Sequence, residues 1–252
     1  MKFAKKLKIK NFIILFFAGI INAVGATIFS AQTIIKDKMK YKYIIWDWNG
    51  TLFDDVKISV DTMNIMLEKT GYKNRINSEL YKNIFTFPVS DYYQKTGFDF
   101  SKDRFDDLAK IYVEVYTALQ FTAKINSEAE NVLRRIKSLN IKQIIVSACE
   151  KNRLLNQVEH FGIQNYFDDI LGIDDDLAVG KAGIAKNWFD KNSISKSEVL
   201  FIVDTTHDFE VSNQIGCDCI LVSCGHQSKD VLETTNAPVL DKLCQIETFL
   251  DL

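Results

Sequence analysis

The chain has 252 residues, of which 47% are hydrophobic, 25% charged and 12% aromatic, with only two prolines. This composition excludes a disordered chain, a collagen-like repeat and a small disulfide-rich protein, which all depart strongly from globular averages. The net charge is -2, but residues 1–38 hold seven lysines and one acid, so the remainder carries -8. Because nucleic-acid affinity depends on clustered Lys and Arg, we expect no nucleic-acid partner.

The N-terminal segment, residues 1–38, is compatible with three interpretations. Its first lysines precede an apolar run over residues 12–31, and a basic stretch before an apolar one is typical of an export signal. The run is also close to the roughly 20 residues that span a bilayer, which fits a membrane anchor. Alternatively, the true start is Met39 and this segment is an upstream misreading. A membrane is a partner only if residues 12–31 are a real anchor.

From Tyr43 onward, short apolar runs alternate with segments of helical period. The runs cover residues 43–46, 144–146, 170–171, 199–203 and 219–222. Continuous apolar runs predict strands that are covered on both faces, as in a parallel sheet. Helical spacing between them predicts helices over residues 129–136, 154–161 and 185–189. This alternation predicts an α/β fold with a doubly wound, mainly parallel sheet and a Rossmann-like core.

Residues 56–125 interrupt the alternation and show no strand pattern. Val56, Val60, Met63 and Leu67 lie at helical spacing, and the pattern ends at Gly71. We interpret this segment as a helical cap inserted after the first strand. The domain organisation is then an N-terminal segment (1–38), a first core piece with one strand and the loop after it (39–55), the cap (56–125) and the remaining core (126–252).

Two patterns predict helix starts. Ser127 and Glu130 have the spacing of a capping box, in which a hydroxyl and a carboxylate each bind a free backbone N–H. Asp54 and Asp55 directly precede the first helix of the cap, and we expect them to cap it.

The five cysteines are an odd number, which would leave at least one unpaired in an oxidising compartment. The spacing of Cys217, Cys219 and Cys224 does not fit a zinc site, which usually has two separated pairs. We interpret Cys217 and Cys219 as core side chains on one face of a strand. Their number favours a reducing compartment, so we expect a cytoplasmic protein, with an anchor or an export signal as the alternatives.

Three polar residues directly follow predicted strands: Asp47, Ser147 and Asp204. In open α/β sheets, ligands bind outside the carboxyl ends of the strands, so these side chains should converge. Asp208 lies four residues after Asp204, and Lys181 opens the helix before that strand. Carboxylates at this density repel one another, so we expect a cation, and Mg2+ prefers oxygen ligands. An Asp can attack phosphorus while Lys, Ser and Mg2+ stabilise the transferring group.

These residues resemble the four motifs of haloacid dehalogenase-like hydrolases, in order and in spacing. The matching residues are Asp47-Trp48-Asn49-Gly50-Thr51-Leu52, Ser147, Lys181 and Asp204-x3-Asp208. The chain is most similar to phosphoglycolate phosphatase-like members with a helical cap after the first motif. The resemblance implies a hydrolase of phosphoric monoesters that acts on a small phosphorylated metabolite through an aspartyl-phosphate intermediate.

The resemblance also implies a role for each matching residue. Asp47 is the implied nucleophile. The implied Mg2+ ligands are Asp47, Asp204, Asp208 and the backbone carbonyl of Asn49. The implied phosphate contacts are Gly50, Thr51, Ser147 and Lys181, where Ser147 binds a phosphoryl oxygen and Lys181 orients the nucleophile and the phosphate.

Two positions depart from the family pattern. Asn49 stands where these phosphatases usually have a second Asp, which is the general acid for the leaving group and the base for water. An amide cannot transfer protons in this way. Val203 replaces the usual Gly before the last motif, which is a milder change. Asn49 therefore keeps two alternatives open: a catalytically impaired phosphate-binding or regulatory protein, and a phosphonate hydrolase or phosphotransferase of the same fold.

The histidines add little at this stage. His207 lies between the two acids of the last motif and is compatible with a contact to substrate or to metal-bound water, although a plain loop position is favoured. No sequence pattern assigns a role to His226.

Overall fold

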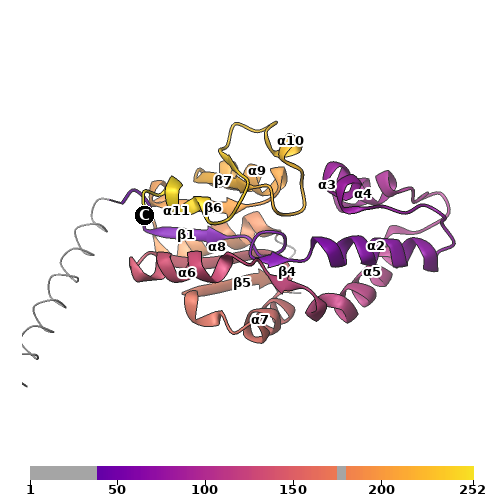
Figure 1. Cartoon of the computed structure of the whole chain (residues 1–252), viewed down its shortest axis with the longest axis horizontal. Helices are drawn as coiled ribbons and strands as arrows, with labels where there is room; N and C mark the ends of the chain where they lie inside the picture. The colour runs from indigo at the N-terminus through magenta and orange to yellow at the C-terminus, as the bar shows by residue number, and fades with distance from the viewer. Residues whose placement is uncertain (1–38, 175–179) are drawn as a thin grey trace, which may run out of the picture. The chain divides into compact units, whose positions relative to one another are not determined.

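A computed structural model describes residues 39–174 and 180–252 of the chain. A six-stranded parallel sheet is at the centre of the core, in the order β5-β4-β1-β6-β7-β8 (Figure 1). The strands are β1 (Tyr43–Trp46), β4 (Lys142–Glu150), β5 (Asp169–Ile173), β6 (Val199–Val203), β7 (Asp218–Val222) and β8 (Val239–Leu240). Numbered within the core alone, this is the 3-2-1-4-5-6 order of a doubly wound sheet. The predicted Rossmann-like α/β core is confirmed.

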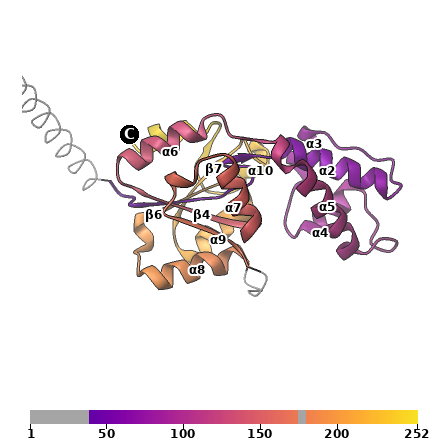
Figure 2. The same cartoon turned by 90° about the horizontal axis from the view of Figure 1, so that it is seen from below.

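Helices cover both faces of this sheet. They are α6 (Ala129–Ser138), α7 (Lys151–His160), α8 (Lys181–Asn192), α9 (Thr206–Ile215), α10 (Lys229–Leu232) and α11 (Gln245–Phe249), with 3-10 turns at Gln120–Thr122, Gln164–Tyr166 and Lys196–Glu198. Figure 2 shows α6 and α8 on opposite sides of the strands. On the α8 side, Ile45, Phe201 and Trp188 belong to one buried cluster. The apolar runs within the strands are therefore continuous because each face of the sheet has a helix against it.

Four further helices follow β1 before the chain returns to the sheet. They are α2 (Val56–Lys69), α3 (Ser78–Ile84), α4 (Val89–Thr96) and α5 (Phe105–Leu119), which together we call the helical insert. A two-stranded antiparallel ribbon, β2 (Phe53–Asp54) with β3 (Lys124–Ile125), stands where the chain leaves and re-enters the core. In Figure 1 the insert lies beyond one end of the sheet.

The helical insert has a hydrophobic cluster of its own. The predicted stripe of Val56, Val60, Met63 and Leu67 is buried on one face of α2 and packs against residues of α3, α4 and α5. The spacing of these four residues was therefore sufficient to place the buried face of the first insert helix.

The predicted capping box at Ser127 and Glu130 is wrong. The helix α6 begins at Ala129, and no side chain caps its first turn. Instead, the side chain of Asn126 accepts the backbone N–H of Glu128 (3.0 Å), and Glu130 binds Arg134 (2.7 Å) one turn further along. At this helix start, a turn closed by the side chain of Asn126 therefore takes the place of the capping box.

Two expectations from the sequence concern the cysteines and a membrane-spanning segment. Cys217 and Cys219 both belong to the cluster under α8 and α9, as predicted for core side chains, and neither is in a disulfide bond. Among residues 39–174 and 180–252, no helix is both long and apolar enough to cross a bilayer. The apolar run over residues 12–31, with its three interpretations, lies outside the described residues.

Candidate functional site

Asp47 and Asp204 stand at the point where the strand order of the sheet reverses. Asp47 directly follows β1 and Asp204 directly follows β6, and these two strands pair in parallel. The backbone N–H of Asp47 still donates to the carbonyl of Ile202 (3.0 Å), so the hydrogen-bond ladder continues to Asp47. Doubly wound sheets bind ligands at such a switch point.

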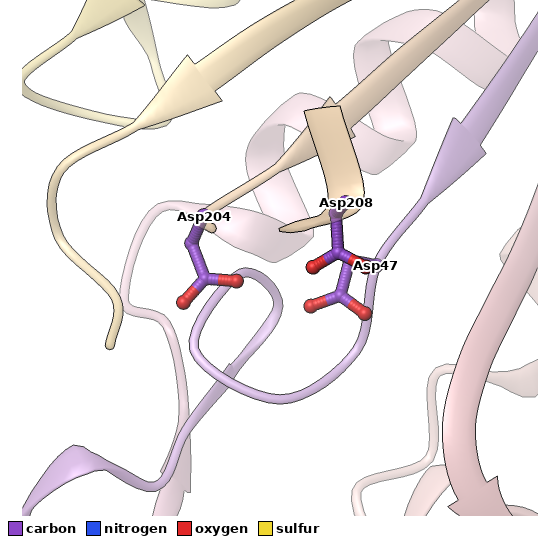
Figure 3. Close-up of side chains that lie close together, drawn as sticks. All are labelled: Asp47, Asp204 and Asp208. Carbon is purple, nitrogen blue, oxygen red and sulfur yellow. The ribbon is translucent and has the colours of Figure 1, made fainter. Parts of the chain in front are cut away.

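Three buried carboxylates meet there (Figure 3). Oxygen atoms of Asp47, Asp204 and Asp208 lie within 4.8 Å of one another. Lys181, the first residue of α8, links two of them: its Nζ is 2.5 Å from Asp47 Oδ1 and 2.7 Å from Asp208 Oδ1. All four side chains are buried. When ionised, the group therefore carries a net charge of -2 inside the protein.

The pKa shifts show how strongly these charges interact. Burial raises the pKa of Asp47 well above its usual range; Lys181 opposes this effect, and Asp208 and Asp204 strengthen it. Burial likewise raises the pKa of Asp204. Burial disfavours the ammonium of Lys181, but Asp208 and Asp47 outweigh it and raise its pKa, so Lys181 stays charged. The cluster lacks positive charge, which a divalent cation would supply.

The donor set fits Mg2+. All available ligand atoms in the cluster are oxygens, and hard cations such as Mg2+ and Mn2+ prefer carboxylate, carbonyl and water oxygens. No nitrogen or sulfur atom belongs to the cluster among the described residues. The chemistry of the site therefore suits the metal that the motifs imply.

The orientation of Asp208 follows from a local cap. Thr205 is the N-cap of α9: its hydroxyl oxygen accepts the backbone N–H of Asp208 (3.2 Å), and the hydroxyl donates to Asp208 Oδ2 (2.6 Å). With Oδ2 held by Thr205, Oδ1 is left to contact Lys181. The start of one helix thus places a charged side chain in the site.

The loop after β1 passes very close to Asp204. Gly50 has φ +75°, and a Cβ atom there would lie 2.1 Å from Asp204 Oδ2, so only glycine fits. The hydroxyl of Thr51 lies 3.2 Å from Asp204 Oδ1 and 3.4 Å from Asp47 Oδ2. Gly50 and Thr51 therefore fix the loop against the carboxylates.

Asn49 is hydrogen-bonded to Asp55, which we expected to cap the first helix of the insert. Its Nδ2 donates to Asp55 Oδ2 (2.8 Å) and to the hydroxyl oxygen of Tyr116 (2.9 Å), and Tyr116 donates to the same Asp55 oxygen (2.6 Å). The other oxygen of Asp55 accepts the backbone N–H of Gly50 (2.9 Å). Asp55 does occupy the N-cap position of α2, but its side chain makes no capping hydrogen bond, and Asp54 lies in β2. The predicted capping role of both residues is therefore wrong.

His226 was not found from the sequence, and it is buried in the site. Its backbone N–H donates to Asp204 Oδ2 (2.6 Å), its Nε2 is 3.1 Å from Asp55 Oδ1, and its Nδ1 is 2.7 Å from the hydroxyl of Tyr81. Burial opposes its positive charge, but Asp55 outweighs burial and raises the pKa of His226 to about 9. The signal that would have found it is its place in the loop just after β7, at the same edge of the sheet.

A cavity of about 530 Å³ lies beside this cluster, with walls from the core and from the insert. Asp47, Ser147 and Lys181 line it, whereas Gly50 and Thr51 are buried outside its lining. The hydroxyl oxygen of Ser147 accepts the backbone N–H of Cys149 (3.0 Å). His207 also lines the cavity and stacks on Phe87 of the insert; it lies in the first turn of α9 and not in a loop.

The fold and this site define an α/β protein with a buried acidic cluster at the switch point of a doubly wound sheet. Residues 44–222 match the family of haloacid dehalogenase-like hydrolases, and the chain belongs to this family.

One relative and two solved structures are similar to this chain in sequence or in fold. The chain is 27% identical over 140 residues to a protein of Caldanaerobacter subterraneus that is named as a pyrophosphatase, PpaX; the match covers 54% of this chain and 60% of that protein. The fold is similar to a predicted phosphatase from Clostridium acetobutylicum (TM-score 0.72, 20% identity), over 84% of this chain and 99% of that one. It is also similar to a predicted phosphoglycolate phosphatase from Haemophilus somnus (TM-score 0.70, 15% identity), over 84% and 99% of the two chains.

Proposed function

We propose that this chain is a Mg2+-dependent phosphatase that hydrolyses a phosphoric monoester of a small metabolite. The observation that carries the proposal is the placement of Asp47 at the switch point, in contact with Lys181 and within a cluster of three carboxylates. Membership of a hydrolase family, and relatives that are named as phosphatases, support it.

The proposed reaction has two displacements at phosphorus. An Asp47 oxygen forms a bond to phosphorus, and the bond from phosphorus to the leaving oxygen breaks, with its electron pair going to that oxygen. Water then attacks the phosphorus of the aspartyl phosphate and releases inorganic phosphate and the Asp47 carboxylate. The net change is the hydrolysis of one ester bond by one water molecule.

Each neighbouring residue has a proposed part in this reaction. Asp47, Asp204, Asp208 and the backbone carbonyl of Asn49 would hold Mg2+, which would offset charge on the transferring group. Lys181 is fixed by two carboxylates and keeps its charge beside the nucleophile. Ser147 lines the cavity and donates to a phosphoryl oxygen. Gly50 and Thr51 hold the loop after β1 beside the phosphate.

Replacing the nucleophile tests this proposal. Asp47→Asn keeps the shape of the side chain and removes its charge, so phosphatase activity should fall by orders of magnitude. EDTA should remove the activity of the unmodified chain, and added Mg2+ should restore it. Asp190→Asn, which alters an exposed ion pair on α8, is the matched control. Substantial turnover by Asp47→Asn, or in EDTA, would exclude the mechanism.

The contacts of Asn49 favour one second candidate, a phosphate-binding or regulatory protein. Both amide hydrogens of Asn49 are engaged by Asp55 and Tyr116, so this position supplies no proton for a leaving group. A chain that binds inorganic phosphate with Mg2+ but hydrolyses neither aryl, acyl nor alkyl phosphates would be such a protein. Cleavage of a phosphonate, or transfer to an added alcohol in place of water, would instead identify the other activities open to the fold.

A further inference from the structure

The insert side of the cavity is made of uncharged, mainly aromatic residues. Its rings are Tyr81, Phe85, Phe87, Tyr92, Tyr93, Tyr112 and Tyr116. Burial raises the pKa of each of these five tyrosines above the usual value, so all of them are neutral phenols. No Asp, Glu, Lys, Arg or His of residues 56–119 lines this cavity. The cations that line it, Arg153, Lys181 and His226, come from the core.

This division indicates which part of a substrate lies where. A phosphate group belongs at the core end, beside Asp47 and Lys181. The organic group then faces the rings of the insert, which offer apolar area and the faces and edges preferred by another ring. A second phosphate or a carboxylate on that group would find no charged partner on the insert wall. The wall therefore suits neither a pyrophosphate nor an acid such as phosphoglycolate.

Asn49 gives an independent argument about the leaving group. The amide donates to Asp55 and Tyr116 and has no proton to transfer to a leaving oxygen. Both ring nitrogens of His226, which lies in the loop after β7, are engaged by Asp55 and Tyr81. An aliphatic alkoxide is a poor leaving group without an acid, but a phenolate, with a conjugate pKa of about 10, leaves without one. The same argument disfavours the phosphate ester of a quaternary amino alcohol, although aromatic cages can bind such cations.

Hydrogen bonds between the insert and the core hold the two walls of the cavity together. The backbone N–H of Ser228 donates to the carbonyl of Lys82 (3.0 Å), and Gln227 Nε2 donates to the carbonyl of Phe85 (2.9 Å). On α5, Tyr116 donates to Asp55 of the core loop. With α3 and α5 both tied to core loops beside the site, the structure favours a small ligand over an extended peptide.

We propose that the substrate is a small phosphomonoester whose phosphate is bonded directly to an aromatic ring, and that the rings of the insert bind this ring. The proposal rests on the phosphatase function proposed above and narrows its substrate to one chemical class.

The first experiment separates ring binding from leaving-group chemistry. Benzyl phosphate and cyclohexylmethyl phosphate have similar size, and both have alkoxide leaving groups. Their ratio of kcat/KM, measured on the full chain with Mg2+ and compared with the ratio for a variant that lacks an insert ring, therefore reports ring recognition. We expect benzyl phosphate to be preferred by about threefold to tenfold, the value of one or two aromatic contacts. Phenyl phosphate should exceed both by a larger factor because it needs no acid. We call the kcat/KM for benzyl phosphate divided by that for cyclohexylmethyl phosphate the benzyl ratio, and a benzyl ratio of one would overturn the proposal. Faster turnover of phosphocholine or phosphoglycolate than of benzyl phosphate would also overturn it.

Variants locate the effect in the insert. Phe87 lines the cavity and stacks on His207 (centroids 4.5 Å apart), and Phe87→Leu keeps apolar volume while it removes the ring. This variant should bring the benzyl ratio close to one. Phe121→Leu is the control, because Phe121 is an exposed aromatic residue outside the cavity. Equal effects of the two substitutions, or no effect of either, would contradict the proposal.

A binding measurement keeps this proposal separate from the proposed function. Phenylphosphonate and cyclohexylphosphonate cannot be cleaved at an ester bond, and ligand-observed NMR with Mg2+ compares their affinities. Preference for phenylphosphonate without any turnover would leave the ring-binding site standing and refute the phosphatase. Turnover without a preference for phenylphosphonate would support the phosphatase and refute the ring-binding site. Faster turnover of a phosphotyrosine peptide than of phenyl phosphate would overturn the restriction to small molecules.

Discussion

At the scale of single residues, Lys181 holds the acidic cluster together. Its ammonium lies between Asp47 and Asp208, and all three side chains are at least nine-tenths buried. Removing one partner of a buried ion pair leaves an uncompensated charge, which is usually far more costly than losing a surface pair. Both the stability of the fold and the proposed chemistry therefore depend on Lys181.

Lys181→Met should lower the free energy of unfolding by about 3–5 kcal/mol without metal, because Asp47 and Asp208 then repel each other in the interior. Saturating Mg2+ should recover part of the loss. Urea denaturation with and without Mg2+ measures both effects. Lys186→Met, on the same helix, breaks an exposed pair with Asp190 and should cost at most about 1 kcal/mol. Similar losses for the two variants would show that Lys181 carries little of the stability.

Asn49 and Asp55 form a second residue-scale unit, with an amide where the family has an acid and a carboxylate 2.8 Å away. Asn49→Asp alone places two carboxylates together and should cost about 1–3 kcal/mol of stability. The swap Asn49→Asp/Asp55→Asn keeps one charge and should recover stability. It should also raise kcat/KM for alkyl phosphates relative to aryl phosphates, by up to about 10²–10⁴-fold.

The swap has a built-in control. Asp55→Asn alone removes the carboxylate charge beside Asn49 without supplying an acid, so it should not raise the ratio of alkyl to aryl turnover. If the swap leaves this ratio unchanged, Asn49 acts by positioning the loop, or another group supplies the proton.

At the scale of elements, buried tyrosines of α3 and α4 line the cavity, and Tyr81 and Tyr92 differ in whether the hydroxyl has a hydrogen-bond partner. The hydroxyl of Tyr81 on α3 bonds to His226 Nδ1 at 2.7 Å. The hydroxyl of Tyr92 on α4 is buried without a hydrogen-bond partner among residues 39–174 and 180–252. Helix α3 is therefore tied to the core by a polar contact, whereas Tyr92 of α4 contributes apolar packing.

This difference predicts opposite results for one substitution. Tyr81→Phe should lower the free energy of unfolding by about 1 kcal/mol, since it leaves His226 Nδ1 without its partner. Tyr92→Phe should leave stability unchanged or raise it, because it removes a buried hydroxyl that bonds to nothing described. Chemical denaturation of the two variants side by side tests this, and a larger loss for Tyr92→Phe would contradict it.

At the scale of the molecule, residues 40–252 form one compact unit. Its two described hydrophobic clusters, one under α8 and α9 and one in the insert, draw all their residues from position 43 onward. The strand β1 is the first element of the sheet. Tyr41, two residues before this strand, donates its hydroxyl to Asp218 Oδ2 (2.8 Å).

A chain that starts at Met39 should therefore fold cooperatively and stay in solution, with the same Mg2+-dependent activity as the full chain. Its free energy of unfolding should lie within about 0.5 kcal/mol of the full-chain value, as expected where no described core contact is lost. Calorimetry of both chains measures this. If the shorter chain aggregates while the full chain does not, the N-terminal segment is structural.

Most of the central sheet could be predicted from the sequence, whereas its edge strand and the helix caps could not. Strands β1 and β6 begin and end at the predicted residues, and β4, β5 and β7 contain the predicted runs, because a strand buried on both faces leaves an unbroken apolar signature. The edge strand β8, only two residues long and half-buried, leaves no such signature. Helix caps were predicted less well, since several polar side chains near a helix start compete for the same N–H groups.

The sequence by itself determined the α/β class, the strands that deliver Asp47 and Asp204, and the helical nature of the insert, because each depends on local periodicity or on a side chain directly after a strand. Only the tertiary structure decided what Asp55 and His226 do. Their partners lie on segments distant in the chain, Tyr116 for Asp55 and both Tyr81 and Asp204 for His226, and no local pattern encodes such contacts. The aromatic wall of the cavity was likewise visible in the sequence only as a high content of rings; packing α3, α4 and α5 together decided that these rings face the acidic cluster.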